Sequence, residues 1–398
     1  MVRLWSSTIN NDEPATERTT MPSRLITLCL LLAAFVLLPA IAFAADPIER
    51  IELLPPSPEN PRNSEGDFIQ LKDGRLLFIY SHYTGGSDDD STAHLASRES
   101  TDGGATWSEE SKTVIENHAK DNIMSVSLLR LPDGSIAMFY LAKESWTDCR
   151  PVVRFSKDEA RTWSEPVMVI PDSDVDYYVL NNDRVIELKS GRLLLAVAQH
   201  TPINGRFNGN GKMVCYYSDD HGQTWTRSET TPDPTPLNGK PVVLQEPGLV
   251  ELKDGRVMMF VRTNGGSQYL SYSADHGETW TQLEPSELIS PVSPATIERL
   301  PQTGDLVCVY NNHADITKEL AGKRTPLSVA LSKDDGDNWT IIGDLYTNPN
   351  GWYCYTAMDV VDDHIVLGHC AGDRTKNNGL AQTNITRVPV SWIYNTNN

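Results

Sequence analysis

The sequence predicts an all-β fold, a six-bladed β-propeller, from two repeated motifs that keep a constant register with each other. The first motif is an eight-residue box of the form Ser-x-Asp-x-Gly-x-Thr-Trp. Its five copies occupy residues 100–107, 156–163, 218–225, 273–280 and 332–339, the second with Ala160 for Gly and the fifth with Asn338 for Thr. Successive copies begin 56, 62, 55 and 59 residues apart, a period typical of propellers and other repeat folds. Ser and Asp can bond nearby backbone amides and Trp can pack the turn onto its sheet, so we expect the boxes to be structural.

The second motif is a hairpin, an Asp-Gly-like turn between two apolar runs rich in strand-forming residues. It is clearest at residues 68–80, and its turn recurs at residues 133–134, 190–191, 254–255, 303–304 and 363–364. An Asp-Gly turn between such runs is a strong signal for a β-hairpin. Six hairpins, five of them followed by a box, predict six blades of about four strands in one domain, residues 45–398. We expect residues 48–54 and 382–388 to supply strands that complete the sixth blade and close the ring.

Residues 1–44 are predicted to be an N-terminal extension and a signal peptide. A basic start precedes an apolar run, residues 25–43, and small residues at Ala42 and Ala44 suit cleavage after Ala44. The alternative is a membrane anchor, but the run is short for a membrane span and contains Pro39. We therefore expect a secreted or periplasmic protein that keeps no stable membrane span after cleavage.

The charge and the cysteines of the chain limit its partners. The 398 residues carry a net charge of −19, which argues against nucleic acid and anionic membranes. Five of the six cysteines lie beyond residue 44 without C-x-x-C spacing, so we expect no zinc, no other metal and no cofactor. Their odd number leaves any disulfide pairing open.

Candidate site residues follow from the propeller geometry, because equivalent positions of the blades meet around one central opening. If the turns and boxes lie at one end, each innermost strand begins at the other end. Nine residues before the turn glycine the chain carries Glu65, Ser125, Asn182 and Glu246, and the same offset from His364 gives Tyr355.

Five arginines are expected near the same end of the propeller: Arg62, Arg150, Arg184, Arg262 and Arg324. Each of them by itself could be a solvated rim residue in a salt bridge. Their joint placement in an acidic protein instead predicts an anion site, since planar guanidinium groups bind a carboxylate through two parallel hydrogen bonds.

These motifs resemble the sialidase (neuraminidase) superfamily with Asp-box, or BNR, repeats, over nearly all of the predicted propeller. The resemblance is most specific at residues 245–262, where Gln-Glu-Pro-Gly-Leu-Val precedes Met-Met-Phe-Val-Arg. It implies that Glu246 is the catalytic Glu and that Arg262 is the second arginine of the family's triad. In the same way it implies that Arg324 is the third arginine and that Tyr355 is the nucleophile.

The resemblance also implies an acid/base aspartate in the loop at residues 85–90, although adjacent aspartates are also typical of a plain solvated loop. The candidates there are Asp88, Asp89 and Asp90. The family's first strand opens with Arg-Ile-Pro, whereas here Arg62 falls about two residues short of that position and Glu65 is an additional acid. Arg184 is the alternative for the missing arginine, and this departure leaves the substrate open.

The resemblance implies a secreted sialidase-like exo-glycosidase, a retaining glycoside hydrolase that removes terminal sialic acid or a related acidic sugar from glycans. An anomeric carbon with its own carboxylate would repel a carboxylate nucleophile, whereas a neutral phenol activated by a Glu base avoids this repulsion. Tyr355 is expected to be that phenol, with Tyr353 as its competitor. Two alternatives stay open: a propeller glycosidase or lyase for another uronate-like sugar, and a non-catalytic glycan-binding propeller.

Overall fold

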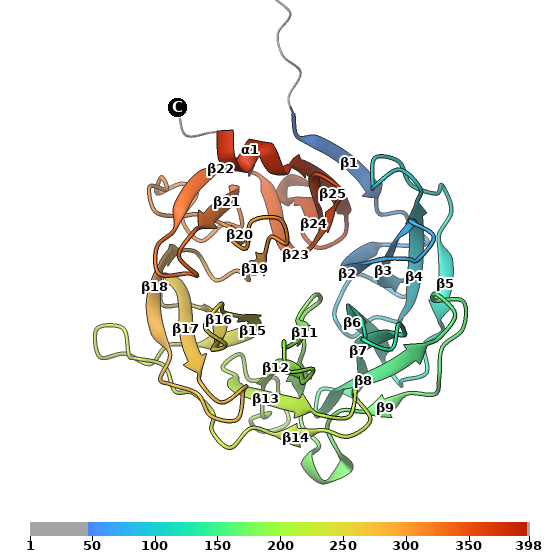
Figure 1. Cartoon of the computed structure of the whole chain (residues 1–398), viewed down its shortest axis with the longest axis horizontal. Coiled ribbons are helices and arrows are strands. Elements are labelled where there is room, and N and C mark those ends of the chain that lie inside the picture. The colour runs from blue at the N-terminus through green and yellow to red at the C-terminus, as the bar shows by residue number, and fades with distance from the viewer. Residues whose placement is uncertain (1–46, 396–398) are drawn as a thin grey trace, which may run out of the picture. The chain divides into compact units, whose positions relative to one another are not determined.

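The computed structural model describes residues 47–395, which form six β-sheets arranged as blades around a central axis (Figure 1). The predicted six-bladed β-propeller is confirmed. The predicted signal peptide lies outside the described residues. Within residues 47–395, no helix has the length and apolar character needed to cross a membrane.

Each blade is an antiparallel sheet whose strands follow one another from the axis outwards. The first contains β2 (Arg62–Gln70), β3 (Leu76–Tyr83), β4 (Ala93–Ser100) and β5 (Lys112–Ile115). The second contains β6 (Asn122–Arg130), β7 (Ile136–Ser145), β8 (Asp148–Ser156) and β9 (Val167–Met168). The third has a broken innermost strand and contains β10 (Tyr178–Val179), β11 (Val185–Glu187), β12 (Leu193–Gln199), β13 (Lys212–Ser218) and β14 (Thr226–Arg227).

The next two blades are regular. The fourth contains β15 (Leu244–Glu251), β16 (Val257–Thr263), β17 (Ser267–Ser273) and β18 (Glu284–Ile289). The fifth contains β19 (Thr296–Arg299), β20 (Leu306–Tyr310), β21 (Leu327–Ser332) and β22 (Thr340–Tyr346).

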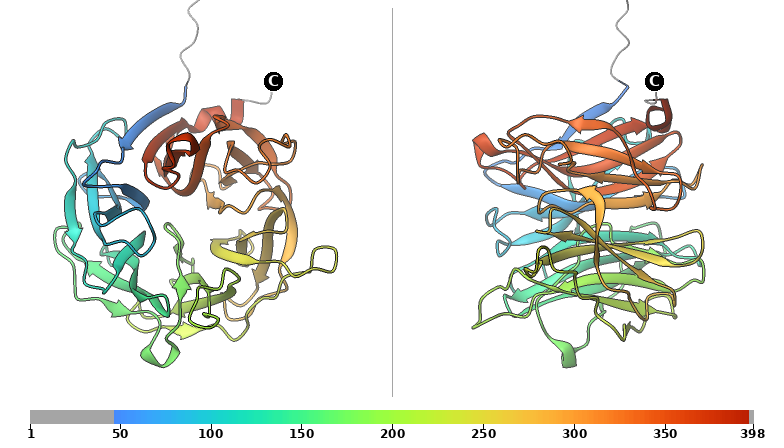
Figure 2. Two further views of the ribbon diagram at one scale, coloured as in Figure 1. Left: turned by 180° about the vertical axis from the view of Figure 1, so that it is seen from behind. Right: turned by 90° about the vertical axis from the view of Figure 1, so that its left-hand side faces the viewer.

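The sixth blade joins the two ends of the described chain, as predicted. It contains β23 (Gly351–Val361), β24 (His364–Asp373), β25 (Thr383–Pro389) and, outermost, β1 (Glu49–Leu54). β1 pairs antiparallel with β25, with Ile51 opposite Ile385, and the view from behind shows the same closed ring (Figure 2). The short helix α1 (Val390–Asn395) follows β25.

The boxes form the turns between the third and fourth strands of the first five blades, where they were predicted. In the fourth blade Ser273 Oγ accepts the Gly277 N–H at 2.8 Å, and Asp275 Oδ1 accepts the Thr279 N–H at 2.8 Å. Trp280 packs into the core between the third and fourth blades. The boxes therefore have a structural role, because each one closes a turn and fixes it to the neighbouring sheet.

The core lies between neighbouring blades. Among the described residues, the buried apolar side chains form six clusters, one at each junction of adjacent blades. At the junction of the first and second blades, for example, Ile79 packs with Ile123 and Met138. Since side chains packed at interior density resist displacement, these clusters hold the innermost strands in fixed positions.

Four carboxyl groups gather on or beside the innermost strands, between the axial opening and the hairpin turns. They line one cavity and are Asp67, Asp183, Glu298 and Asp359. Burial raises the pKa of each, and the charge of Asp183 raises the pKa of the other three further. Backbone amides offset part of this effect, since Asp67 accepts two N–H groups, each at 2.7 Å.

The substitution Asp359→Asn is expected to stabilise the protein at neutral pH. Burial raises the pKa of Asp359 from its ordinary value of 3.8 to about 6, so the fold binds its proton more tightly than the unfolded chain does. The charged form therefore costs stability, and this cost grows as the pH rises from about 4 to about 6. Urea unfolding should show the variant more stable by about 1–3 kcal/mol at about pH 7.5 and no more stable at about pH 4. An equal gain at both pH values would contradict this account.

Candidate active site

Four innermost strands carry a β-bulge at the axial opening, and one residue in each bulge has a positive φ. These residues are Glu65 (φ 46°), Ser125 (φ 60°), Glu246 (φ 46°) and Tyr355 (φ 54°). A positive φ is uncommon outside glycine and costs about 1 kcal/mol or more, but it turns the side chain out of the normal strand alternation. In the third blade, where the innermost strand is broken, the positive φ falls on Asp183 (57°) and not on the predicted Asn182.

The bulges open into one cavity of about 270 Å³ at this end of the axis. Its lining divides into a charged part and an apolar part. The charged part contains Glu65, Asp89, Glu246, Arg262 and Arg324, with the uncharged Tyr355 among them. The apolar part comes from the second and third blades and contains Met124, Leu141, Trp146, Tyr177, Val179 and Phe207. Six predicted site residues therefore share one cavity.

A chain of hydrogen bonds crosses the charged part from the sixth blade to the fourth. Tyr355 donates its hydroxyl proton to Glu246 Oε1 at 3.0 Å, and Arg262 Nη1 donates to Glu246 Oε2 at 2.5 Å. Burial alone would raise the pKa of Glu246, but Arg262 and Arg324 lower it below its ordinary value. Burial raises the pKa of Tyr355, and the Glu246 charge raises it further. At neutral pH the pair is therefore a neutral phenol hydrogen-bonded to a charged carboxylate.

Arg324 lies beside this pair and keeps free donors. Its Nη1 donates to Cys354 Sγ at 2.9 Å, and its guanidinium lies 5.4 Å from the centre of the Tyr355 ring. None of the described residues accepts a hydrogen bond from its Nε or Nη2. Arg262 likewise donates through Nη1 alone in the described part of the chain, which leaves Nη2 unpaired, and its Nε is both buried and unpaired. Two guanidinium groups therefore have N–H groups available for an anion.

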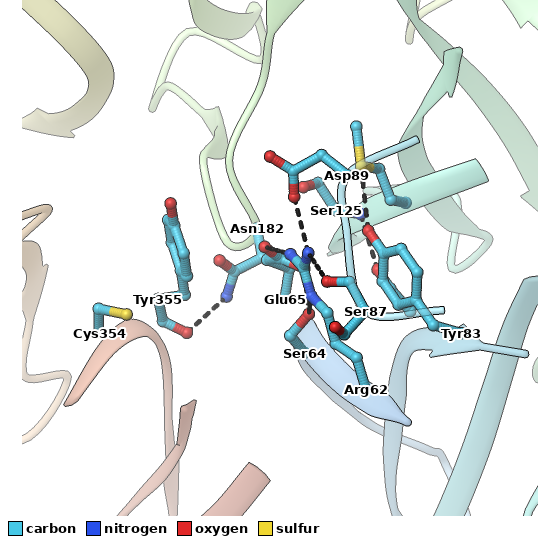
Figure 3. Close-up of polar contacts among 12 residues, drawn as sticks. Arg62, Ser64, Glu65, Tyr83, Ser87, Asp89, Ser125, Asn182, Cys354 and Tyr355 are labelled. Carbon is cyan, nitrogen blue, oxygen red and sulfur yellow. Dashed lines mark hydrogen bonds and ion pairs between the residues drawn. The ribbon is translucent and has the colours of Figure 1, made fainter. Parts of the chain in front are cut away.

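The first blade presents carboxylates to the cavity in place of a cation. Arg62 is 2% exposed and donates to Glu65 Oε1 and to Asp89 Oδ1, both at 2.7 Å. Its Nε donates to Ser64 Oγ at 2.8 Å, and its guanidinium lies 4.5 Å from the centre of the Tyr83 ring. Figure 3 shows Arg62 enclosed by these partners. Burial raises the pKa of Glu65, although the Arg62 charge opposes this shift.

The structure places the other predicted site residues away from this cavity. Arg150 forms ion pairs of 2.7 and 2.9 Å with two nearby aspartates. Arg184 is buried near the axis, where its Nη2 donates to a backbone carbonyl of the fifth blade at 2.6 Å. Asp88 and Asp90 are exposed and do not line the cavity. Among residues 47–395, no group of three or more His, Cys, Asp or Glu side chains is arranged to hold a metal ion.

Several residues that line the cavity were not predicted from the sequence. Gln245 and Asn181 each stand next to a predicted position, so the same offset rule with a tolerance of one residue would have found them. Trp146, Tyr177 and Phe207 form an aromatic wall, in which the rings of Trp146 and Tyr177 stack at 5.6 Å. These three residues lie outside both repeats, so no periodic signal marks them.

Asn182 holds two of the bulges from across the axis. It is fully buried, and its Nδ2 donates to the Gly66 carbonyl at 2.9 Å. The same Nδ2 donates to the Tyr355 carbonyl at 3.1 Å (Figure 3). The neighbouring Asp183 accepts the Met358 N–H at 3.0 Å. The irregular inner segment of the third blade therefore fixes the backbone on which Tyr355 stands.

The family described as "BNR repeat-like domain" matches residues 83–367, most of the propeller. The chain belongs to the sialidase (BNR repeat) superfamily. Similar members are a sialidase of Micromonospora viridifaciens, 28% identical over 303 residues, and a sialidase of Paraclostridium sordellii, 25% identical over 239 residues. The matches cover 68% and 54% of this chain but 44% and 56% of those proteins, so the chain spans about half the length of these relatives.

Solved structures show the same propeller in other proteins. Trypanosoma rangeli sialidase in complex with the inhibitor DANA superimposes with a TM-score of 0.66 at 16% identity, over 86% of this chain and 60% of that one. A protein of unknown function from Dyadobacter fermentans gives a TM-score of 0.66 at 18% identity, over 86% of this chain and 99% of that one. At these identities the likeness shows the fold of this BNR repeat protein and nothing further.

The substitution Asn182→Ala is expected to destabilise the BNR repeat propeller by about 2–3 kcal/mol, because it leaves two buried carbonyls without their donor. Urea unfolding followed by tryptophan fluorescence would measure this loss. Asn350→Ala is the matched control, since Asn350 is exposed and its side chain has no hydrogen bond in the described structure. If both variants unfolded at the same urea concentration as the wild type, Asn182 would have no such role.

Proposed function

We propose that this BNR repeat protein is a retaining glycoside hydrolase of the sialidase type, which acts after secretion or in the periplasm on glycans that end in an acidic sugar. The observation that carries the proposal is the 3.0 Å hydrogen bond from Tyr355 to Glu246 in a cavity that also holds Arg262 and Arg324. A shielded phenol, a charged base beside it and two guanidinium groups with free donors suit attack on a sugar that carries a carboxylate.

In the proposed mechanism the two arginines hold the substrate carboxylate and Tyr355 attacks the anomeric carbon. Glu246 accepts the phenol proton while the glycosidic bond breaks, and Asp89 donates a proton to the leaving oxygen. A water molecule then attacks the glycosyl–tyrosine intermediate, with Asp89 as base, and Glu246 returns the proton to the departing phenol. Two successive inversions retain the configuration at the anomeric carbon.

Asp89 is the best placed of the three adjacent aspartates to serve the leaving group. It lines the cavity, and its side chain is 55% exposed, so both a leaving group and a water molecule can reach it. Arg62 binds Oδ1 and leaves Oδ2 free for the substrate.

A second candidate function is a glycosidase or lyase for another uronate-like sugar. The geometry of the first blade favours this function. Arg62 already forms ion pairs with Glu65 and Asp89, and no third arginine of the described chain lines the cavity. Two arginines can still bind a carboxylate in a different orientation. Tyr355 and Glu246 could have the same catalytic roles in either of the two candidate functions.

Turnover of a fluorogenic α-sialoside, measured beside a panel of uronic acid oligosaccharides, separates the candidates. Release of sialic acid supports the proposed function, and turnover of the uronides alone favours the second candidate. Saturable binding of either ligand without turnover would indicate a glycan-binding propeller and would contradict the proposed hydrolase.

The substitution Tyr355→Phe is expected to lower turnover by roughly 10³-fold or more, because it removes only the nucleophilic hydroxyl. Binding of the acidic sugar, measured by calorimetry, should stay within about threefold, since the arginines are untouched. Tyr353→Phe is the matched control: Tyr353 is buried against Tyr346, with ring centres 4.8 Å apart, and does not line the cavity. Mass spectrometry with a fluorinated substrate should find a glycosyl adduct on Tyr355, and near wild-type turnover of Tyr355→Phe would exclude this mechanism.

The substitution Asp89→Asn is expected to slow the release of poor leaving groups by about 10²–10⁴-fold, because they need a proton, and to slow activated aryl leaving groups far less. Rates over a series of aryl and sugar glycosides would measure this difference. Asp88→Asn and Asp90→Asn are the controls on either side in the sequence. Full turnover of Asp89→Asn on a substrate with a poor leaving group would place the acid elsewhere.

A further inference from the structure

The loop that carries Asp89, residues 84–92 between β3 and β4, is tied to the second blade by two side chains. Asn122 Nδ2 donates to the carbonyls of Asp89 and Ser91, both at 2.9 Å. Lys143 Nζ donates to the same Asp89 carbonyl, also at 2.9 Å. Two donors therefore converge on the backbone of the one loop aspartate that lines the cavity.

Lys143 is an unusual donor, because its ammonium group is buried without forming an ion pair, although Asp89, Asp121 and Asp90 lie near enough to act on its charge. The residue is 0% exposed, and its Nζ lies 3.6 Å from the centre of the Trp146 ring and 5.6 Å from that of Tyr177. Within the described chain it forms no ion pair, and the bond to Asp89 is its one side-chain hydrogen bond. The ring faces attract a cation, but an ammonium removed from water loses more hydration than one carbonyl restores.

Burial makes a charge costly at this position, and the nearby aspartates offset only part of that cost. A methionine would occupy nearly the same length without removing a charge from water, and replacing buried charges by apolar side chains is often neutral or stabilising. The ammonium does add a connection. Trp146, Tyr177 and Asp89 all line the cavity. Lys143 donates to the Asp89 carbonyl and lies against the rings of Trp146 and Tyr177.

We propose that Lys143 is a positioning residue, which fixes Asp89 over the cavity by holding its carbonyl against the aromatic wall of Trp146 and Tyr177. This inference rests on the proposed role of Asp89 as general acid and base. Proton transfer requires the carboxyl group within hydrogen-bond reach of the leaving oxygen, and a small displacement lowers the rate strongly. Lys143 is enclosed and does not itself touch the substrate.

The substitution Lys143→Met tests this role. The kcat for poor leaving groups should fall by about 10–100-fold, the kcat for activated aryl glycosides by less than about threefold, and KM should change by less than about threefold for both. Backbone amides of residues 84–92 should exchange hydrogen about tenfold faster. The midpoint of thermal unfolding should stay unchanged or rise, which separates lost positioning from lost folding.

Lys112→Met is the matched control, because Lys112 is an exposed β5 lysine that pairs with Glu99 at 3.0 Å. It should leave both kinetic series and the exchange of the loop unchanged. Equal losses for good and poor leaving groups in Lys143→Met, or unchanged exchange in residues 84–92, would overturn the positioning role. If Asp89→Asn shows no leaving-group dependence, the proposed acid fails and this inference with it. If Asp89→Asn shows that dependence and Lys143→Met does not, this inference alone fails.

Discussion

The positive-φ bulge at the axial end of the innermost strands is the constraint on which the whole site depends. In a regular strand successive side chains point to opposite faces of the sheet, here towards the two neighbouring blades. The bulge breaks this alternation and directs one residue at the axis in each of four blades. Tyr355 and Glu246 are 109 residues apart in the chain and form a hydrogen bond because both occupy this position. The packed junctions between blades supply the rigidity that sustains the strained backbone.

Two groups of buried carboxyl side chains near the axis have opposite shifts in pKa. At the opening, Arg262 and Arg324 keep Glu246 charged, while burial keeps the phenol of Tyr355 neutral. Farther along the same strands, carboxyl groups such as Asp67 and Asp359 lack a guanidinium partner, and burial favours their protonated forms. The local placement of arginines therefore sets which buried carboxyl group stays charged, although the net charge of the chain is −19.

The fold and the central pair of the site could be predicted because both follow from repetition. Because each sequence repeat forms one blade, residues at the same distance before the hairpin turn occupy equivalent positions around the axis. A distance of nine residues before the turn therefore predicted Glu65, Glu246 and Tyr355. The offset failed at the third blade, where a broken strand moves the positive φ to Asp183. The offset from the turn also does not predict where a long side chain such as that of an arginine will point. Arg150 and Arg184 turn to aspartates and backbone carbonyls. The aromatic wall comes from three separate segments outside both repeats, which carry Trp146, Tyr177 and Phe207.

On the proposed function, the first blade would limit how an acidic sugar lies in the cavity. Arg62 directs its guanidinium at Glu65, Asp89 and Ser64 and is 2% exposed, so its charge is neutralised before any ligand arrives. A substrate carboxylate against this wall would meet two acidic side chains and no free cation, and like charges at contact distance repel strongly in a partly dry site. The carboxylate of such a substrate would lie towards Arg262 and Arg324, and the group that faces the first blade would be a hydrogen-bond donor such as a hydroxyl. In the first blade the chain differs from the family, because Arg62 points at Glu65 and Asp89 and not into the cavity. On the proposed function, this orientation would restrict which groups of the sugar ring can face the first blade.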